Sequence, residues 1–87
     1  MSPAIIDTED AILGEAPRPE QFLRLGMMCS TGQCLPLDMV AAHKWFNIAA
    51  MQGDSEAAQL RREIAAEMSE REIAAAQRAA RDWVTRH

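Results

Sequence analysis

Residues 22–57, FLRLGMMCSTGQCLPLDMVAAHKWFNIAAMQGDSEA, decide the fold of this chain. Apolar residues recur in this stretch at spacings of three and four, which is the period of a helix buried along one side. The pattern is interrupted once, between Gly32 and Leu37, where Pro36 lies. Glycine suits the left-handed end of a helix and proline has no amide proton to donate. The stretch therefore predicts two helices joined by a turn of fixed length.

The first of these helices is expected to cover residues 19–31. Pro19 is tolerated at a first helical position, and the apolar residues after it are Phe22, Leu25, Met28 and Cys29. The second helix should begin after Asp38, a good N-cap, and end at Gly53. Its apolar face consists of Met39, Ala42, Trp45, Phe46, Ala49 and Ala50.

Two further helices are expected in the C-terminal half. A third should begin near Asp54, with a stripe formed by Ala57, Leu60, Ile64 and Met68. Ser69 and Glu72 then form a capping box, which predicts that a fourth helix begins at Glu70. Its buried stripe would be Ile73, Ala76, Ala80, Trp83 and Val84. The predicted fold class is all-α with about four main helices.

Several of these positions coincide with a known repeat. Residues 22–57 resemble the Sel-one-like repeat (SLR), a relative of the tetratricopeptide (TPR) repeat. The positions that carry the resemblance are Leu25-Gly26, Gly32, Asp38, Ala42, Trp45, Ala49-Ala50, Gly53 and Ala57. Cys29 stands where the family has an aromatic residue, and Cys34 stands where it has a second turn glycine. The turn is therefore expected to be stiffer than the family norm.

The resemblance implies antiparallel helix pairs of an α/α superhelix. Residues 1–18 would then be a flexible or partly helical N-terminal segment. Residues 19–87 would form a helical repeat domain with one SLR unit at 22–57 and a C-terminal capping helix pair. Solenoids usually need about three repeats to bury a continuous core. One and a half repeats leave open ends, which residues 1–18 or a second protein chain would have to cover.

Composition narrows the classes of partner. The 87 residues carry a formal net charge of −4, and the isoelectric point is about 5.0, so nucleic acid and anionic membranes are not attracted at long range. No apolar run reaches the roughly 18 residues of a membrane span, and no signal-peptide pattern begins the chain. We expect a cytoplasmic protein with no nucleic-acid or membrane partner.

Enzymatic and metal-dependent functions have little support in the sequence. Cys29, Cys34, His43 and His87 could be imagined as zinc ligands, but their spacing differs from that of structural zinc sites. We expect Cys29 in the core, Cys34 in an exposed turn and His43 as a partly exposed packing residue. No catalytic residue, metal site or cofactor is predicted. A metal- or thiol-dependent protein using Cys29 and Cys34 remains the remote alternative.

The function that the sequence favours is protein–protein interaction by a small helical-repeat module, an adaptor or scaffold that binds a protein or peptide. The first and third helices are expected to line a shallow groove. The candidate partner-binding residues are those left exposed after the cores are assigned: Arg24, Met27, Gln59, Arg62 and Glu63. The alternative is a structural protein whose main role is self-association, for example as a homodimer.

Overall fold

The computed structural model of the chain describes residues 18–32 and 37–86. These ranges contain four α-helices: α2 at Pro19–Thr31, α3 at Met39–Met51, α4 at Ser55–Ala65 and α5 at Glu70–Arg86. The described ranges contain no strand, so the all-α prediction is confirmed for them. None of these helices is both long enough and apolar enough to cross a membrane.

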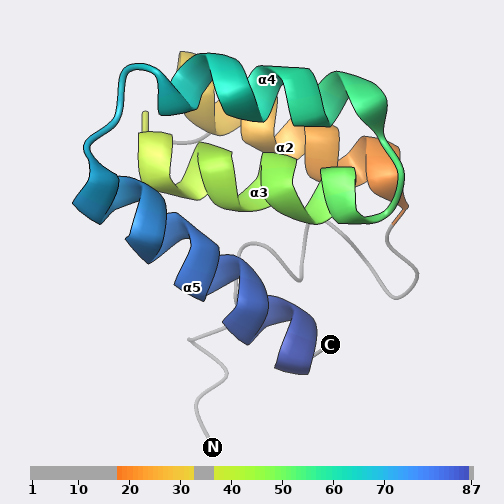
Figure 1. The fold of residues 1–87 in the computed structure, drawn as a ribbon. Helices are drawn as coiled ribbons and strands as arrows, with labels where there is room; N and C mark the ends of the chain where they lie inside the picture. Colours follow the sequence, from red (N-terminus) through yellow and green to blue (C-terminus); the bar gives the residue numbers. More distant parts are fainter. Residues whose placement is uncertain (1–17, 33–36, 87) are drawn as a thin grey trace, which may run out of the picture.

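Helix α3 is the centre of the arrangement. Helices α2, α3 and α4 run in alternating directions, and α5 crosses them obliquely (Figure 1). Each of α2, α4 and α5 packs against α3. Because α3 has neighbours on three sides, more of its surface is buried than the single apolar face that the sequence predicts. Ile48, which lay outside the predicted apolar face, is 1% exposed for this reason.

The helix ends follow the local signals of the sequence. Asp38 Oδ1 accepts a hydrogen bond from the Ala41 amide at 3.0 Å, and Asp54 Oδ1 accepts one from the Ala57 amide at 3.0 Å. Gly32 ends α2 in the left-handed region, with φ at 74°. The predicted N-cap Asp38, the predicted start of the third helix near Asp54 and the predicted glycine C-cap are therefore confirmed.

The capping box before α5 is also confirmed. The Glu72 amide donates to Ser69 Oγ at 3.0 Å, and the Ser69 amide donates to Glu72 Oε1 at 2.8 Å. These two backbone amides have no carbonyl acceptor within the helix, and the capping box supplies a side-chain acceptor for each of them. Helix α5 begins at Glu70, as the sequence predicts.

Two helix ends and one buried position differ from the predictions. Helix α3 ends at Met51 rather than at Gly53, and α4 ends at Ala65, so Met68 packs against the core from the connection that follows. In α5, Ala76, Ala80 and Trp83 are buried, whereas Val84 is 47% exposed. Val84 follows Trp83 directly, and successive helical residues point about 100° apart. The stripe that buries Trp83 turns Val84 towards solvent.

The predicted N-terminal segment, residues 1–18, lies outside the described residues except for Arg18, the N-cap of α2. The predictions for Cys34 and His87 also fall outside them.

Candidate functional site

Three aromatic rings fix α2 against the rest of the molecule. Phe22 of α2 stacks on Trp45 of α3, with ring centroids 5.9 Å apart and an interplanar angle of 19°. The ring of Trp83, from α5, stands edge-on to both, 5.1 Å from Phe22 and 5.5 Å from Trp45. Offset and edge-to-face geometries at these separations are favourable contacts between aromatic rings. The cluster holds one side of α2 in the core, and the other side of the helix, with Arg24 and Met27, is exposed to solvent.

A glycine allows α2 and α3 to approach closely. A Cβ atom placed on Gly26 would lie 2.5 Å from Cδ1 and Cε1 of Phe46, which is 1% exposed and has little room to move. Only a residue without a side chain fits this crossing. The close approach of α2 and α3 therefore depends on Gly26, and the neighbour that requires a glycine there is Phe46.

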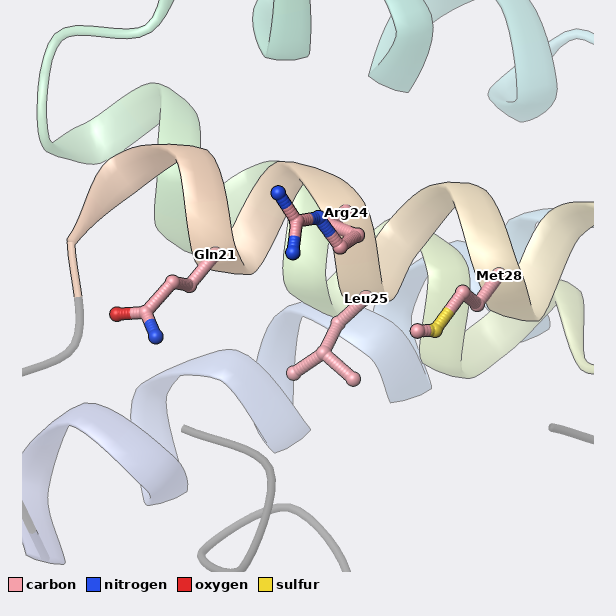
Figure 2. Close-up of a pocket in the computed structure, with 4 residues that line it drawn as sticks. All are labelled: Gln21, Arg24, Leu25 and Met28. Carbon is pink, nitrogen blue, oxygen red and sulfur yellow. The ribbon is translucent and has the colours of Figure 1, made fainter. Parts of the chain in front are cut away.

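A small pocket lies along α2 itself. It is lined by Gln21, Arg24, Leu25 and Met28, at spacings of three and four residues along the helix, and has a volume of about 40 Å³. Leu25 is fully buried, Gln21 and Met28 are half-buried, and Arg24 is exposed. Figure 2 shows Gln21, Leu25 and Met28 extending from the same side of α2, whereas the Arg24 side chain lies across the helix with its guanidinium away from that side. The pocket combines an apolar floor with one cationic side chain.

The two predicted residues of α2 are both exposed. Arg24 lines the pocket, and Met27, 45% exposed, lies three residues further along the same outward side. The backbone carbonyl of Met27 accepts hydrogen bonds from Ser30 Oγ at 3.0 Å and from Thr31 Oγ1 at 2.8 Å. The Met27 side chain therefore stands at the surface of an ordered last turn.

The three predicted residues of α4 form a separate polar patch. Gln59, Arg62 and Glu63 are all exposed, while Ala57 and Ile64 bury the other side of the helix. Gln59 Nε2 donates to Glu63 Oε2 at 3.4 Å, one turn further along. The helical spacing turns this patch away from the α3-facing side of α4. The groove expected between the first and third helices stays a prediction.

His43 differs from its prediction. It was expected to be partly exposed, but it is 3% exposed, and its Nδ1 has no hydrogen-bond partner among the described residues. Burial lowers the pKa of His43, and the positive charge of Arg61 lowers it further. Arg61 Nη1 donates to Asn47 Oδ1 at 2.6 Å, which ties α4 to α3 beside the imidazole. The surroundings of His43 favour its neutral form.

Cys29 is buried in the core cluster, as predicted. Within residues 18–32 and 37–86, no group of three or more His, Cys, Asp or Glu side chains is arranged to hold a metal ion. Cys34 and His87 are outside these ranges, so the zinc and thiol alternatives that depend on them stay untested.

The pocket adds two residues to the predicted surface. Gln21 lies one turn before Arg24, and no role was predicted for it. Met28 lies one turn after Arg24 and was predicted to belong to the apolar face of the helix. The signal that could have found them is the spacing itself, because positions 21, 24, 25 and 28 share one side of a helix. Comparisons with protein families, with curated proteins and with solved structures found no match to this chain.

Proposed function

We propose that this chain is a small helical module for protein–protein interaction, an adaptor or scaffold without catalysis of its own. The observation that supports this proposal is the α2 pocket, where an apolar floor of Leu25 and Met28 lies beside Arg24. An aliphatic side chain on a partner would bury the exposed apolar part of Met28, above the fully buried Leu25. A neighbouring carboxylate would pair with Arg24 in the bidentate geometry that arginine favours.

The size of the pocket favours a protein segment over a metabolite. Small-molecule sites usually have volumes of about 300–1,000 Å³. The α2 pocket has about 40 Å³, room for the end of one aliphatic side chain. A ligand that inserts one side chain and spreads over a helix surface is a peptide, and Met27 offers an adaptable apolar contact next to the pocket.

The proposed relation to Sel-one-like repeats is consistent with the packing of α2 on α3. The family's small and aromatic positions lie where helices meet: Gly26 lies against Phe46, and Ala42, Trp45, Ala49 and Ala57 are buried. In this proposal the α4 patch of Gln59, Arg62 and Glu63 is a second contact region for a longer partner.

The proposal can be tested with two short peptides titrated into the ¹⁵N-labelled full chain. The first has two acidic residues followed by alanine, isoleucine and leucine, and the second has lysine in place of both acids. We expect the acidic peptide to shift the amide signals of Gln21, Leu25 and Met28. The lysine peptide should have at least a several-fold weaker effect, because it would place like charges beside Arg24.

Two variants distinguish the pocket from unspecific binding. Arg24→Gln should weaken binding of the acidic peptide, whereas Arg62→Gln, an exposed arginine on α4, should leave binding of this short peptide unchanged. Shifts that are the same for both peptides, or that are insensitive to Arg24→Gln, would contradict the assignment of the site.

A second candidate function, homo-oligomerisation, is favoured by several large apolar side chains at the surface. Met27, Leu37, Met51 and Val84 are 45%, 65%, 56% and 47% exposed. Sedimentation equilibrium across a wide concentration range decides this candidate. A monomer at all concentrations excludes it, and a dimer that dissociates in a Leu37→Ser or Val84→Ser variant supports it.

A further inference from the structure

His43 is a buried ionisable side chain that the proposed function does not use. It lies on α3 and is 3% exposed, and its Nδ1 has no hydrogen-bond partner among the described residues. Asn47 lies one helical turn further along, on the same side of α3. Its Oδ1 accepts the 2.6 Å hydrogen bond from Arg61 of α4. The imidazole therefore lies at the interface between α3 and α4.

The charged group that acts on the imidazole, among the described residues, is Arg61 of α4. On α3 itself, Lys44 holds its Nζ 3.9 Å from the centroid of the next residue's ring. On α4, the half-buried Asp54 caps the first turn and accepts a hydrogen bond from a backbone amide there. The other charged side chains of α2, α4 and α5 lie at exposed positions. A proton on His43 would thus meet a second positive charge.

Protonation of His43 is costly while α4 is in place. The imidazolium has an N–H donor on both ring nitrogens, and Nδ1 has no acceptor among the described residues. Burial lowers the pKa of His43, and the charge of Arg61 lowers it further. If water reached the imidazole and Arg61 moved away, the pKa would return towards its ordinary value of 6.5. A state in which α4 has moved away therefore binds the proton more readily.

Helix α4 is the helix that can move with the least disruption of the core. It packs mainly on α3 and buries Ala57 and Ile64, whereas the aromatic cluster joins α2 and α5 to α3. Gly53, just before α4, has a φ of 101°, and a Cβ atom there would meet no atom within 4 Å. The backbone angles of a glycine in open space can change without a steric clash. Helix α4 can therefore swing out at Gly53 while the aromatic cluster stays intact.

We propose that protonation of His43 releases α4 from α3, which makes this interface an acid-triggered switch. The released helix carries Arg61 away from the imidazolium and admits water to both ring nitrogens. Above about pH 6.5 the imidazole is neutral and α4 stays in place. This inference goes beyond the proposed function and does not depend on it, because the switch involves no partner.

Hydrogen exchange of the full chain, measured by NMR at pH 7.5 and pH 5.5, tests the release of α4. Protection factors are corrected for the intrinsic effect of pH on exchange, so they report opening of the structure. One proton with an ordinary pKa in the open state raises the opening equilibrium constant by up to about tenfold over this interval. We expect the protection factors of Leu60 and Ile64 to fall several-fold. At pH 5.5 they should lie below those of Phe46 and Ala80.

Three variants identify the groups that act. His43→Leu should remove the effect of pH on α4, and His43→Gln takes its place if the leucine variant does not fold. Arg61→Gln should reduce the effect without abolishing it, because burial is the larger cause of the lowered pKa of His43. Arg62→Gln changes the exposed neighbouring arginine and should leave the effect unchanged.

Two results would overturn the switch. The first is protection of α4 that is the same at both pH values, or a change with pH that persists when His43 is replaced. The second is equal protection of Leu60, Phe46 and Ala80 at pH 5.5, because protonation would then unfold the chain as a whole instead of releasing α4.

Discussion

At the scale of single residues, Gly26 is where one added methyl group has the clearest consequence. Alanine is favoured over glycine inside a helix by about 1 kcal/mol. Here the new Cβ would lie 2.5 Å from the buried ring of Phe46, and overpacking of this kind costs about 1–3 kcal/mol. We expect Gly26→Ala to lower the free energy of unfolding despite its better helix propensity. Urea denaturation measures the change.

The control for this prediction is a double-mutant cycle. Phe46→Leu removes the ring edge that the new methyl group meets, although the smaller side chain carries its own cost. Gly26→Ala should cost less in the Phe46→Leu background than in the wild type. Strictly additive effects of the two substitutions would show that the crossing does not depend on this contact.

His43 gives the second prediction at this scale, a dependence of stability on pH. Its pKa in the folded state is lowered, first by burial and then by Arg61, below the ordinary value of 6.5. Below that ordinary value, the unfolded chain binds a proton at this position more readily than the folded chain does. Stability should therefore fall as the pH drops from about 6.5 towards 5, above the range in which most carboxylates titrate.

The comparison that isolates His43 uses its substitution by a neutral residue. His43→Leu should flatten the slope of the unfolding free energy between pH 6.5 and 5, measured by urea denaturation at each pH. His87 is the other histidine of the chain, and His87→Ala should leave the slope unchanged. A slope that persists in His43→Leu would assign the effect to other groups.

The two residues also show what the sequence could predict. Gly26 is marked in the sequence by its place in a repeat pattern, but the pattern does not name Phe46 as its neighbour. The burial of His43 was not predicted, because histidine is intermediate in its burial preference and its neighbour Lys44 is polar. Its burial depends on α4 packing over that side of α3, which no local spacing encodes.

At the scale of elements, the start of α5 rests on a local hydrogen-bonded motif. The Glu72 amide donates to Ser69 Oγ at 3.0 Å, and loss of such a cap costs about 1 kcal/mol. Ser69→Ala should therefore lower the melting temperature by about 4–8 °C, the shift expected per kcal/mol for a domain of this size. Thermal unfolding followed by circular dichroism measures it. Ser55→Ala, in the first turn of α4, is the matched control and should change the melting temperature little.

The starts of α3, α4 and α5 and the end of α2 were predicted well because their causes are local. The caps at Asp38, Asp54 and Ser69 and the left-handed Gly32 each depend on residues within four positions. Which sides of the helices become buried depends on neighbours far along the chain. Val84 was assigned to the buried stripe wrongly and Ile48 was left out of the buried face for that reason, and of the residues that line the α2 pocket only Arg24 was a predicted binding residue.

At the scale of the whole molecule, the contact between α5 and the first two helices depends strongly on Trp83. Its ring meets Phe22 and Trp45 edge-on and is 5% exposed. Replacing a buried tryptophan by alanine costs about 3–5 kcal/mol. Domains are stable by about 0.05–0.15 kcal/mol per residue, which gives about 4–13 kcal/mol for 87 residues, so this one substitution removes a large part of the stability. We expect Trp83→Ala to abolish cooperative unfolding of the whole chain.

The alternative is that only α5 detaches while α2, α3 and α4 stay folded, and the two cases give different signals. Whole-chain unfolding removes most of the helical circular dichroism and collapses the spread of amide signals from α2 and α3. Detachment of α5 alone would leave the α2 and α3 signals dispersed. Val84→Ala, at the exposed neighbouring position, should melt like the wild type, and Trp83→Phe should retain a cooperative transition at lower temperature. Because Phe22 and Trp45 lose a shared neighbour when Trp83 is removed, we expect α2 to lose its anchor together with α5, and the α2 pocket with it.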